Sequence, residues 1–160
     1  MENEINRIRV RSKDAYIIEV NDAGETIEFD LTDIDLPLRL ERSMQTARET
    51  GEWLNQRLLV IRRREDHTSK GSLLSDNERA AREAYREAYG RLRDAIDAFC
   101  GEGASAKIFG QKNYLEMFSD LMEQLEPHLE KMRAKGMDIR TRIAAKYGAD
   151  EDEKAADEAL

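Results

Sequence analysis

Apolar and polar residues alternate along the N-terminal part of the chain. Two runs, residues 16–20 and 27–31, place their apolar side chains on one face with a repeat of two residues, as in a half-buried β-strand. Residues 21–24, Asn-Asp-Ala-Gly, lie between them and form a turn sequence with glycine where a positive φ is needed. The pattern predicts a hairpin over residues 16–31, alone or with a third strand from residues 6–11, which show the same alternation.

From residue 36 onward, apolar residues recur every three to four positions, which is the repeat of an amphipathic helix. Apolar residues follow it over 36–61, where Asp35 is the expected N-cap and Pro37 lies in the first turn. A second helix is expected over 75–99, because this stretch opens with the capping-box sequence Ser-Asp-Asn-Glu. A glycine-rich corner follows it, and then a short helical piece for which Ser105 is the expected N-cap.

A helix expected to start near Asn113 carries an apolar stripe whose members step by three or four residues, the spacing of a seam between paired helices. Pro127 lies within it and should kink or split the helix, Gly136 should end it, and a last helix is expected over 138–147. The 115–132 stripe consists of Leu115, Met117, Phe118, Met122, Leu125, Leu129 and Met132. It has two interpretations: core packed on the first two helices, or a groove whose adaptable methionines bind a helical partner.

These elements predict an α+β fold with three segments. Residues 1–34 would form an N-terminal β-hairpin or small antiparallel sheet, and residues 35–148 a bundle of four to five helices. Residues 149–160 have no apolar period and are expected to be an acidic disordered tail.

The charge of the chain is concentrated in that tail. Its six acidic residues and one lysine account for −5 of the net charge of −8. An acidic chain is a poor binder of nucleic acid, because phosphate contacts dominate such affinity. No run approaches the roughly eighteen apolar residues of a membrane span, and no signal peptide is visible. We therefore expect a cytoplasmic protein that binds neither nucleic acid nor a membrane.

The residues that could carry chemistry lack partners at useful spacing. His67 and His128 have no cysteine, histidine or acid at metal-ligand spacing, so both are expected to be solvent-exposed or incidental. Cys100, the one cysteine, is expected at the C-terminal end of a helix, where the helix dipole raises a thiol pKa. Residues 101–103, Gly-Glu-Gly, are not followed by the Gly-Lys-Ser/Thr of a phosphate loop. The sequence predicts no catalytic residue, no metal and no cofactor.

The corner between the second helix and the C-terminal one has the most specific pattern, Ile-Asp-x-Phe-Cys-Gly-Glu-Gly-x-Ser-x-Lys-Ile-Phe-Gly. It resembles the tail assembly chaperones of long-tailed (siphovirus-type) bacteriophages and prophages of Gram-positive hosts, which usually have glycine where this chain has Cys100. The resemblance spans about residues 16–135 and includes the N-terminal order of hairpin and helix. The matching residues are Ile96, Asp97, Phe99, Gly101, Glu102, Gly103, Ser105, Lys107, Ile108, Phe109 and Gly110.

The resemblance implies a non-enzymatic function in virion morphogenesis. Such a chaperone binds the tape measure protein, keeps it soluble and recruits tail tube subunits in the host cytoplasm, and it is absent from the mature virion. The 115–132 stripe would then contact the client. The alternative is a homo-oligomeric helical interaction or scaffold protein of a mobile element, which would use the seam spacing for self-association.

Overall fold

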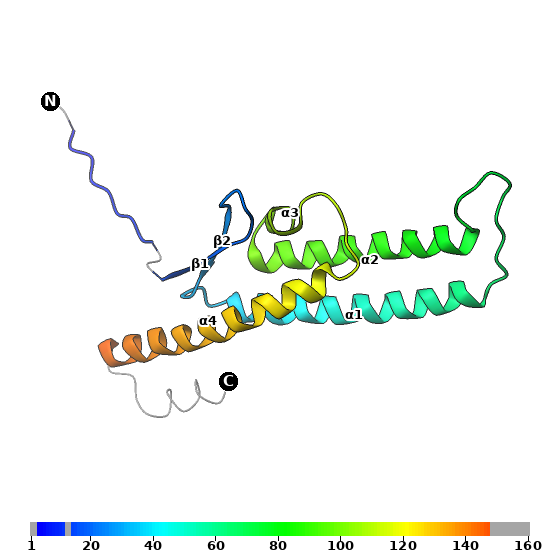
Figure 1. Cartoon of the computed structure of the whole chain (residues 1–160). Coiled ribbons are helices and arrows are strands. Elements are labelled where there is room, and N and C mark those ends of the chain that lie inside the picture. The colour runs from blue at the N-terminus through cyan, green and yellow to red at the C-terminus, as the bar shows by residue number, and fades with distance from the viewer. Residues whose placement is uncertain (1–2, 12–13, 148–160) are drawn as a thin grey trace.

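The computed structural model describes residues 3–11 and 14–147; the tail expected over 149–160 lies outside them. It confirms the α+β fold, with an antiparallel hairpin followed by four helices in the described chain (Figure 1). The elements are β1 (Ala15–Glu19), β2 (Thr26–Asp30), α1 (Leu36–Arg63), α2 (Asp76–Cys100), α3 (Ala104–Phe109) and α4 (Met117–Tyr147).

The hairpin has the expected faces and turn. Tyr16 is paired with Phe29 and Ile18 with Ile27, so these four side chains share the inner face. Gly24 closes the turn with a φ of 81°, a conformation that glycine adopts at no steric cost. The third strand expected from residues 6–11 is wrong, because this segment has no strand structure and extends away from the body (Figure 1).

Helices α1 and α2 lie antiparallel along the long axis of the molecule (Figure 1). Asp35 occupies the N-cap position of α1, although its side chain makes no capping bond; Asp33 instead accepts a hydrogen bond from the Asp35 amide at 2.9 Å. At the start of α2, the Ser75 hydroxyl accepts from the Glu78 amide at 3.1 Å, as the capping-box sequence predicts.

The C-terminal half differs from its prediction, because α4 is one continuous helix of 31 residues that starts at Met117 and runs through Pro127 and Gly136. Of the two alternatives at Pro127, the split is therefore wrong, and so are the helix end at Gly136 and the separate last helix. Proline leaves only one carbonyl without its helical donor, that of Glu123. Glu123 and Pro127 are both exposed, so water can reach that side of the helix, and buried residues before and after Pro127 hold it against the body.

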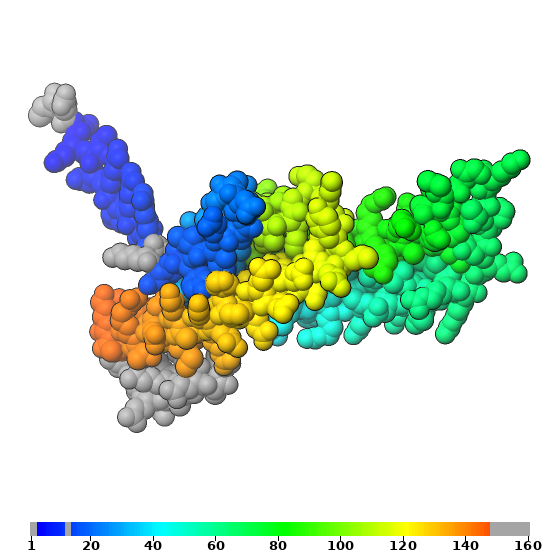
Figure 2. All heavy atoms as spheres, in the orientation of Figure 1, coloured from blue at the N-terminus to red at the C-terminus, as the bar shows by residue number. Residues whose placement is uncertain are grey.

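The core has two parts, and α4 contributes to both. The first joins the hairpin to the end of α2, to α3 and to the middle of α4; within it the rings of Phe29 and Phe99 are 5.0 Å apart. The second joins α1, α2 and the start of α4 around Ala88, Tyr89 and Met117. Helix α4 is longer than the part of it that packs on this core, and its C-terminal end projects beyond the body (Figure 2). In the described residues, no helix combines the length and the apolar character that crossing a membrane requires.

Candidate functional site

The corner after α2 is held by one carboxylate and two glycines. Asp97 Oδ1 accepts a hydrogen bond from the Ser105 amide at 2.7 Å, which satisfies a donor in the first turn of α3. Gly101 and Gly103 have φ values of 111° and 78°, where a side chain would be strained. The expectation that Ser105 caps α3 is wrong: Gly103 is the N-cap, and Asp97 supplies the capping oxygen from the preceding helix.

Helix α3 is fastened to the hairpin by two polar contacts. Lys107 Nζ donates to the Thr26 carbonyl at 3.2 Å, and the Lys107 carbonyl accepts from Asn21 Nδ2 at 3.1 Å. Ile108 packs on the first part of the core. Lys107 and Ile108 of the corner motif therefore hold α3 against the hairpin and the core.

The segment between α3 and α4 is held by Arg93 of α2. Its guanidinium donates to the carbonyls of Gly110 and Lys112 at 2.9 and 2.8 Å and to Asn113 Oδ1 at 3.0 Å. It also lies over the Phe109 ring, 5.4 Å from the ring centroid. Sequence analysis missed Arg93, because nothing local distinguishes it from the other arginines of this helix.

The structure divides the 115–132 stripe between core and surface. Met117, Leu125 and Met132 are buried. Leu129 is partly buried on the first part of the core, and Phe118 on the second. The side chains of Leu115 and Met122 are exposed.

The less buried residues form an outer edge of the stripe, which we define as Leu115, Phe118 and Met122; Leu115 and Met122 are exposed and Phe118 is partly buried. Phe118 and Met122 lie one turn apart on the same face at the start of α4, and Leu115 lies in the turn just before this helix. Phe118 is the anchor of this edge: its ring contacts Tyr89 and Phe109 edge-on, with centroid distances of 4.9 and 5.1 Å. The Tyr89 hydroxyl donates to the Leu115 carbonyl at 2.6 Å, which holds the chain just before α4. The outer edge is thus a small apolar surface on a rigid support.

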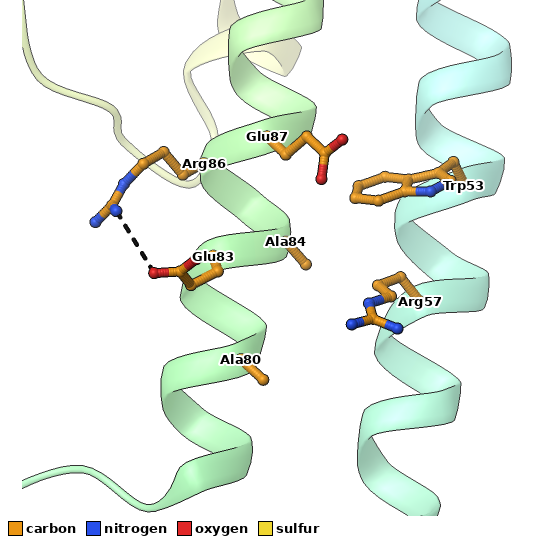
Figure 3. Close-up of a pocket in the computed structure, with 7 residues that line it drawn as sticks. All are labelled: Trp53, Arg57, Ala80, Glu83, Ala84, Arg86 and Glu87. Carbon is orange, nitrogen blue, oxygen red and sulfur yellow. Dashed lines mark ion pairs between the residues drawn. The ribbon is translucent and has the colours of Figure 1, made fainter.

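A second surface feature is an open cleft of about 480 Å³ between α1 and α2 (Figure 3). It forms where Ala80 and Ala84 present short side chains to Trp53 and Arg57 of α1 (Figure 3). The Arg91 guanidinium lies over the Trp53 ring, 4.5 Å from its centroid. The remaining lining residues are Glu83, Arg86 and Glu87. The cleft is charged and open, and the residues of the corner motif do not reach it.

The cysteine and histidine residues that could carry chemistry lie in surroundings that do not favour it. Burial, and secondarily the charge of Asp97, raises the pKa of the Cys100 thiol to about 12, so the thiol stays protonated near neutral pH. The expected rise in the thiol pKa is confirmed, although burial rather than the helix dipole is its main cause. Within the described residues, no group of three histidine, cysteine or acidic side chains could hold a metal ion. His67 lies exposed in the loop between α1 and α2, as expected.

His128 differs from its expectation. It is partly buried, and its Nδ1 lies 2.7 Å from the Tyr16 hydroxyl, so it joins α4 to β1. An incidental, exposed role is therefore wrong for this residue. Its partner is 112 positions away in the sequence, which is why local spacing did not indicate the contact.

The chain belongs to a family of unknown function, DUF6673, whose model matches residues 23–158. The matched range includes β2 and all four helices that the structure describes, together with the corner motif and the 115–132 stripe. No curated protein and no solved structure matches the chain.

Proposed function

We propose that this protein is a non-enzymatic tail assembly chaperone that binds the tape measure protein of a long-tailed phage, keeps it soluble and recruits tail tube subunits. It works in the host cytoplasm during assembly and leaves before the virion is complete. The resemblance of residues 96–110 to that class of chaperones motivates this assignment. It requires a surface that can shield an apolar helix, and no cofactor.

The observation that carries the proposal is the outer edge of the stripe. A helical client presents apolar residues three or four positions apart, so such a helix can lie along Leu115, Phe118 and Met122. Burial of apolar surface contributes about 25 cal/mol per Å². Met122 is 44% exposed and methionine adapts to varied partners, which suits a client with many similar helical segments. Met117, which is buried in the second part of the core where Phe118 packs, supports this edge.

The direct test is co-expression with a tape measure protein from the same genome as this chain, followed by size exclusion of the soluble fraction. The expected result is one soluble complex, with the client insoluble when expressed alone. A client that stays insoluble while this chain elutes unchanged would overturn the proposal. The alternative, a homo-oligomeric scaffold of a mobile element, would then take its place.

A pair of matched variants tests the surface itself. Met122→Asp should abolish co-elution of the client, because it places a charge where apolar contact is needed. Met137→Asp is the control, since Met137 is 40% exposed on the same helix and lies outside the stripe. Both variants should keep the circular dichroism spectrum of the parent. Equal loss of the client in both variants, or in neither, would show that the outer edge is not the client surface.

A further inference from the structure

The N-terminal arm, residues 3–11, is an apolar and basic segment that lies against nothing in the described structure (Figures 1 and 2). Ile8 and Val10 are 92% and 93% exposed. In an extended chain, alternate side chains point to opposite faces, so these two share one face while Arg7, Arg9 and Arg11 share the other. The arm therefore has the residue pattern of a β-strand, although it pairs with no other strand in the described structure.

The hairpin offers an edge that can receive such a strand. The Val20 amide donates to Glu25 and the Leu31 amide to the Asp14 carbonyl, both at 2.9 Å. Since hydrogen-bonded positions alternate in an antiparallel ladder, the main-chain groups of residues 15, 17 and 19 point away from β2. These residues are exposed, and among the described residues no hydrogen bond from another element reaches their main chain.

The opposite edge of the hairpin is less accessible. Lys107 of α3 donates to the Thr26 carbonyl of β2, and α3 lies beside this strand. The outer edge of β1 is therefore the side on which a strand can be added.

The two faces of the arm match the two faces of the hairpin. The inner face next to β1 is apolar, with Tyr16 and Ile18, and Ile8 and Val10 would extend it. The solvent face carries Glu19 on β1 and Glu28 on β2, and the arginines of the arm would lie on the strand next to Glu19. Opposite charges on neighbouring strands are favourable, and the opposite placement would bury arginine against the core. Charge and hydrophobicity thus favour the placement in which the apolar face of the added strand lies on the core side.

The short loop between the arm and β1 does not suit pairing of the arm with β1 of its own chain. A two-residue loop at residues 12–13 would set Arg9 opposite Tyr16, which puts the arginines on the core side. A three-residue loop at residues 12–14 restores the faces, but such loops need a positive φ and this sequence, Ser-Lys-Asp, has no glycine. Asp14 is moreover already held in the ladder by the Leu31 amide. A second copy of the chain has neither constraint.

We propose that the arm of one copy adds as a third strand to the outer edge of β1 in a second copy, so that the chain self-associates by exchanging arms. Reciprocal exchange closes a two-fold dimer in which each copy gives and receives one strand. Ile8 and Val10 become buried, and the open main-chain groups of β1 gain partners. This inference does not depend on the proposed chaperone function, since the arm and the outer edge of the stripe are separate surfaces.

The test is light scattering on the full chain over a dilution series, with one double variant and one control. The parent should be a dimer that dissociates on dilution. Ile8→Asp/Val10→Asp should raise the dissociation constant by about ten-thousandfold, because the two-fold dimer loses four buried aliphatic side chains and each is worth at least about tenfold. Leu73→Asp is the control: Leu73 is fully exposed in the loop between α1 and α2, and its replacement should leave the dimer unchanged.

Charge reversal and hydrogen exchange complete the test. Arg9→Glu should weaken the dimer, and Glu19→Arg in the same chain should restore it. Amides of the arm should be protected from exchange in the dimer and unprotected in the monomeric double variant. A parent chain that is monomeric at every concentration, or a dimer that survives the double variant, would overturn the proposal. A monomer with protected arm amides would do so too, because the arm would then pair with its own β1.

Discussion

The hydroxyl of Tyr16 lies 2.7 Å from Nδ1 of His128, which joins the first strand to the middle of the last helix. The two rings meet edge-on at a centroid distance of 5.8 Å, and Lys135 Nζ lies 5.2 Å from the centroid of the same tyrosine ring. Together with the ion pair between Arg142 and Asp14 at 3.1 Å, this directional contact helps to set the position of α4 on the hairpin, beside the apolar contacts of the first part of the core.

Removal of this bond should destabilise the protein modestly. His128→Phe and Tyr16→Phe should each lower the free energy of unfolding by about 1 kcal/mol, the usual net worth of a hydrogen bond. The double variant should lose less than the sum of the two, because both changes remove the same bond. Urea denaturation measures all three. His67→Phe is the control and should change nothing, since His67 is exposed; strict additivity would contradict a direct Tyr16–His128 bond.

Arg93 should matter more than its surface position suggests. Arg93→Ala leaves the carbonyls of Gly110 and Lys112 without their charged donor, so we expect a loss of about 1 to 2 kcal/mol. Hydrogen exchange should show faster exchange in the segment between α3 and α4. The matched control is Arg86→Ala on the same helix, because Arg86 is exposed and makes only a 3.9 Å ion pair with Glu83 (Figure 3). Equal effects of both changes would show that the contacts of Arg93 do not hold this segment.

Two methionines of the stripe should respond very differently to truncation. Met132→Ala should cost about 3 kcal/mol, because Met132 is buried in the first part of the core and its loss leaves a cavity. Met122→Ala should change the free energy of unfolding by less than about 0.5 kcal/mol, because Met122 is 44% exposed and belongs to neither part of the core. Thermal and urea denaturation give both values. Similar costs at the two positions would mean that the stripe is not divided between core and surface.

Cys100 should make the protein less stable at high pH. The thiol pKa is 9.0 in its ordinary state and about 12 in the fold, so between these values the unfolded chain releases its proton while the folded chain keeps it. The contribution of this group is therefore fully present below pH 9 and is lost as pH rises toward 12.

Urea denaturation of the parent and of Cys100→Ala between pH 8 and pH 11 measures this contribution, and the parent should lose stability more steeply. At pH 8 the native thiol should also react with iodoacetamide far more slowly than in urea. Parallel pH curves for the two proteins, or rapid labelling of the native chain, would contradict the buried neutral thiol.

Sequence patterns predicted the elements that depend on close neighbours. The turn at Gly24, the helix start at Ser75 and the strand faces of the hairpin each involve residues only a few positions apart. The predictions that failed needed distant residues. Pro127 lies in a continuous helix because packing on both sides compensates for one lost bond, and α3 takes its capping oxygen from Asp97 of the helix before it.

The candidate site shows the same division. The spacing of the 115–132 stripe was visible in the sequence, and the sequence alone left its role as core or surface open. An N-terminal hairpin, long amphipathic helices and a glycine-rich corner could be predicted from local patterns, because periodicity and capping act within one or two turns of chain. The burial of Met132 and the exposure of Met122 could not, because burial depends on which side of α4 meets the two parts of the core.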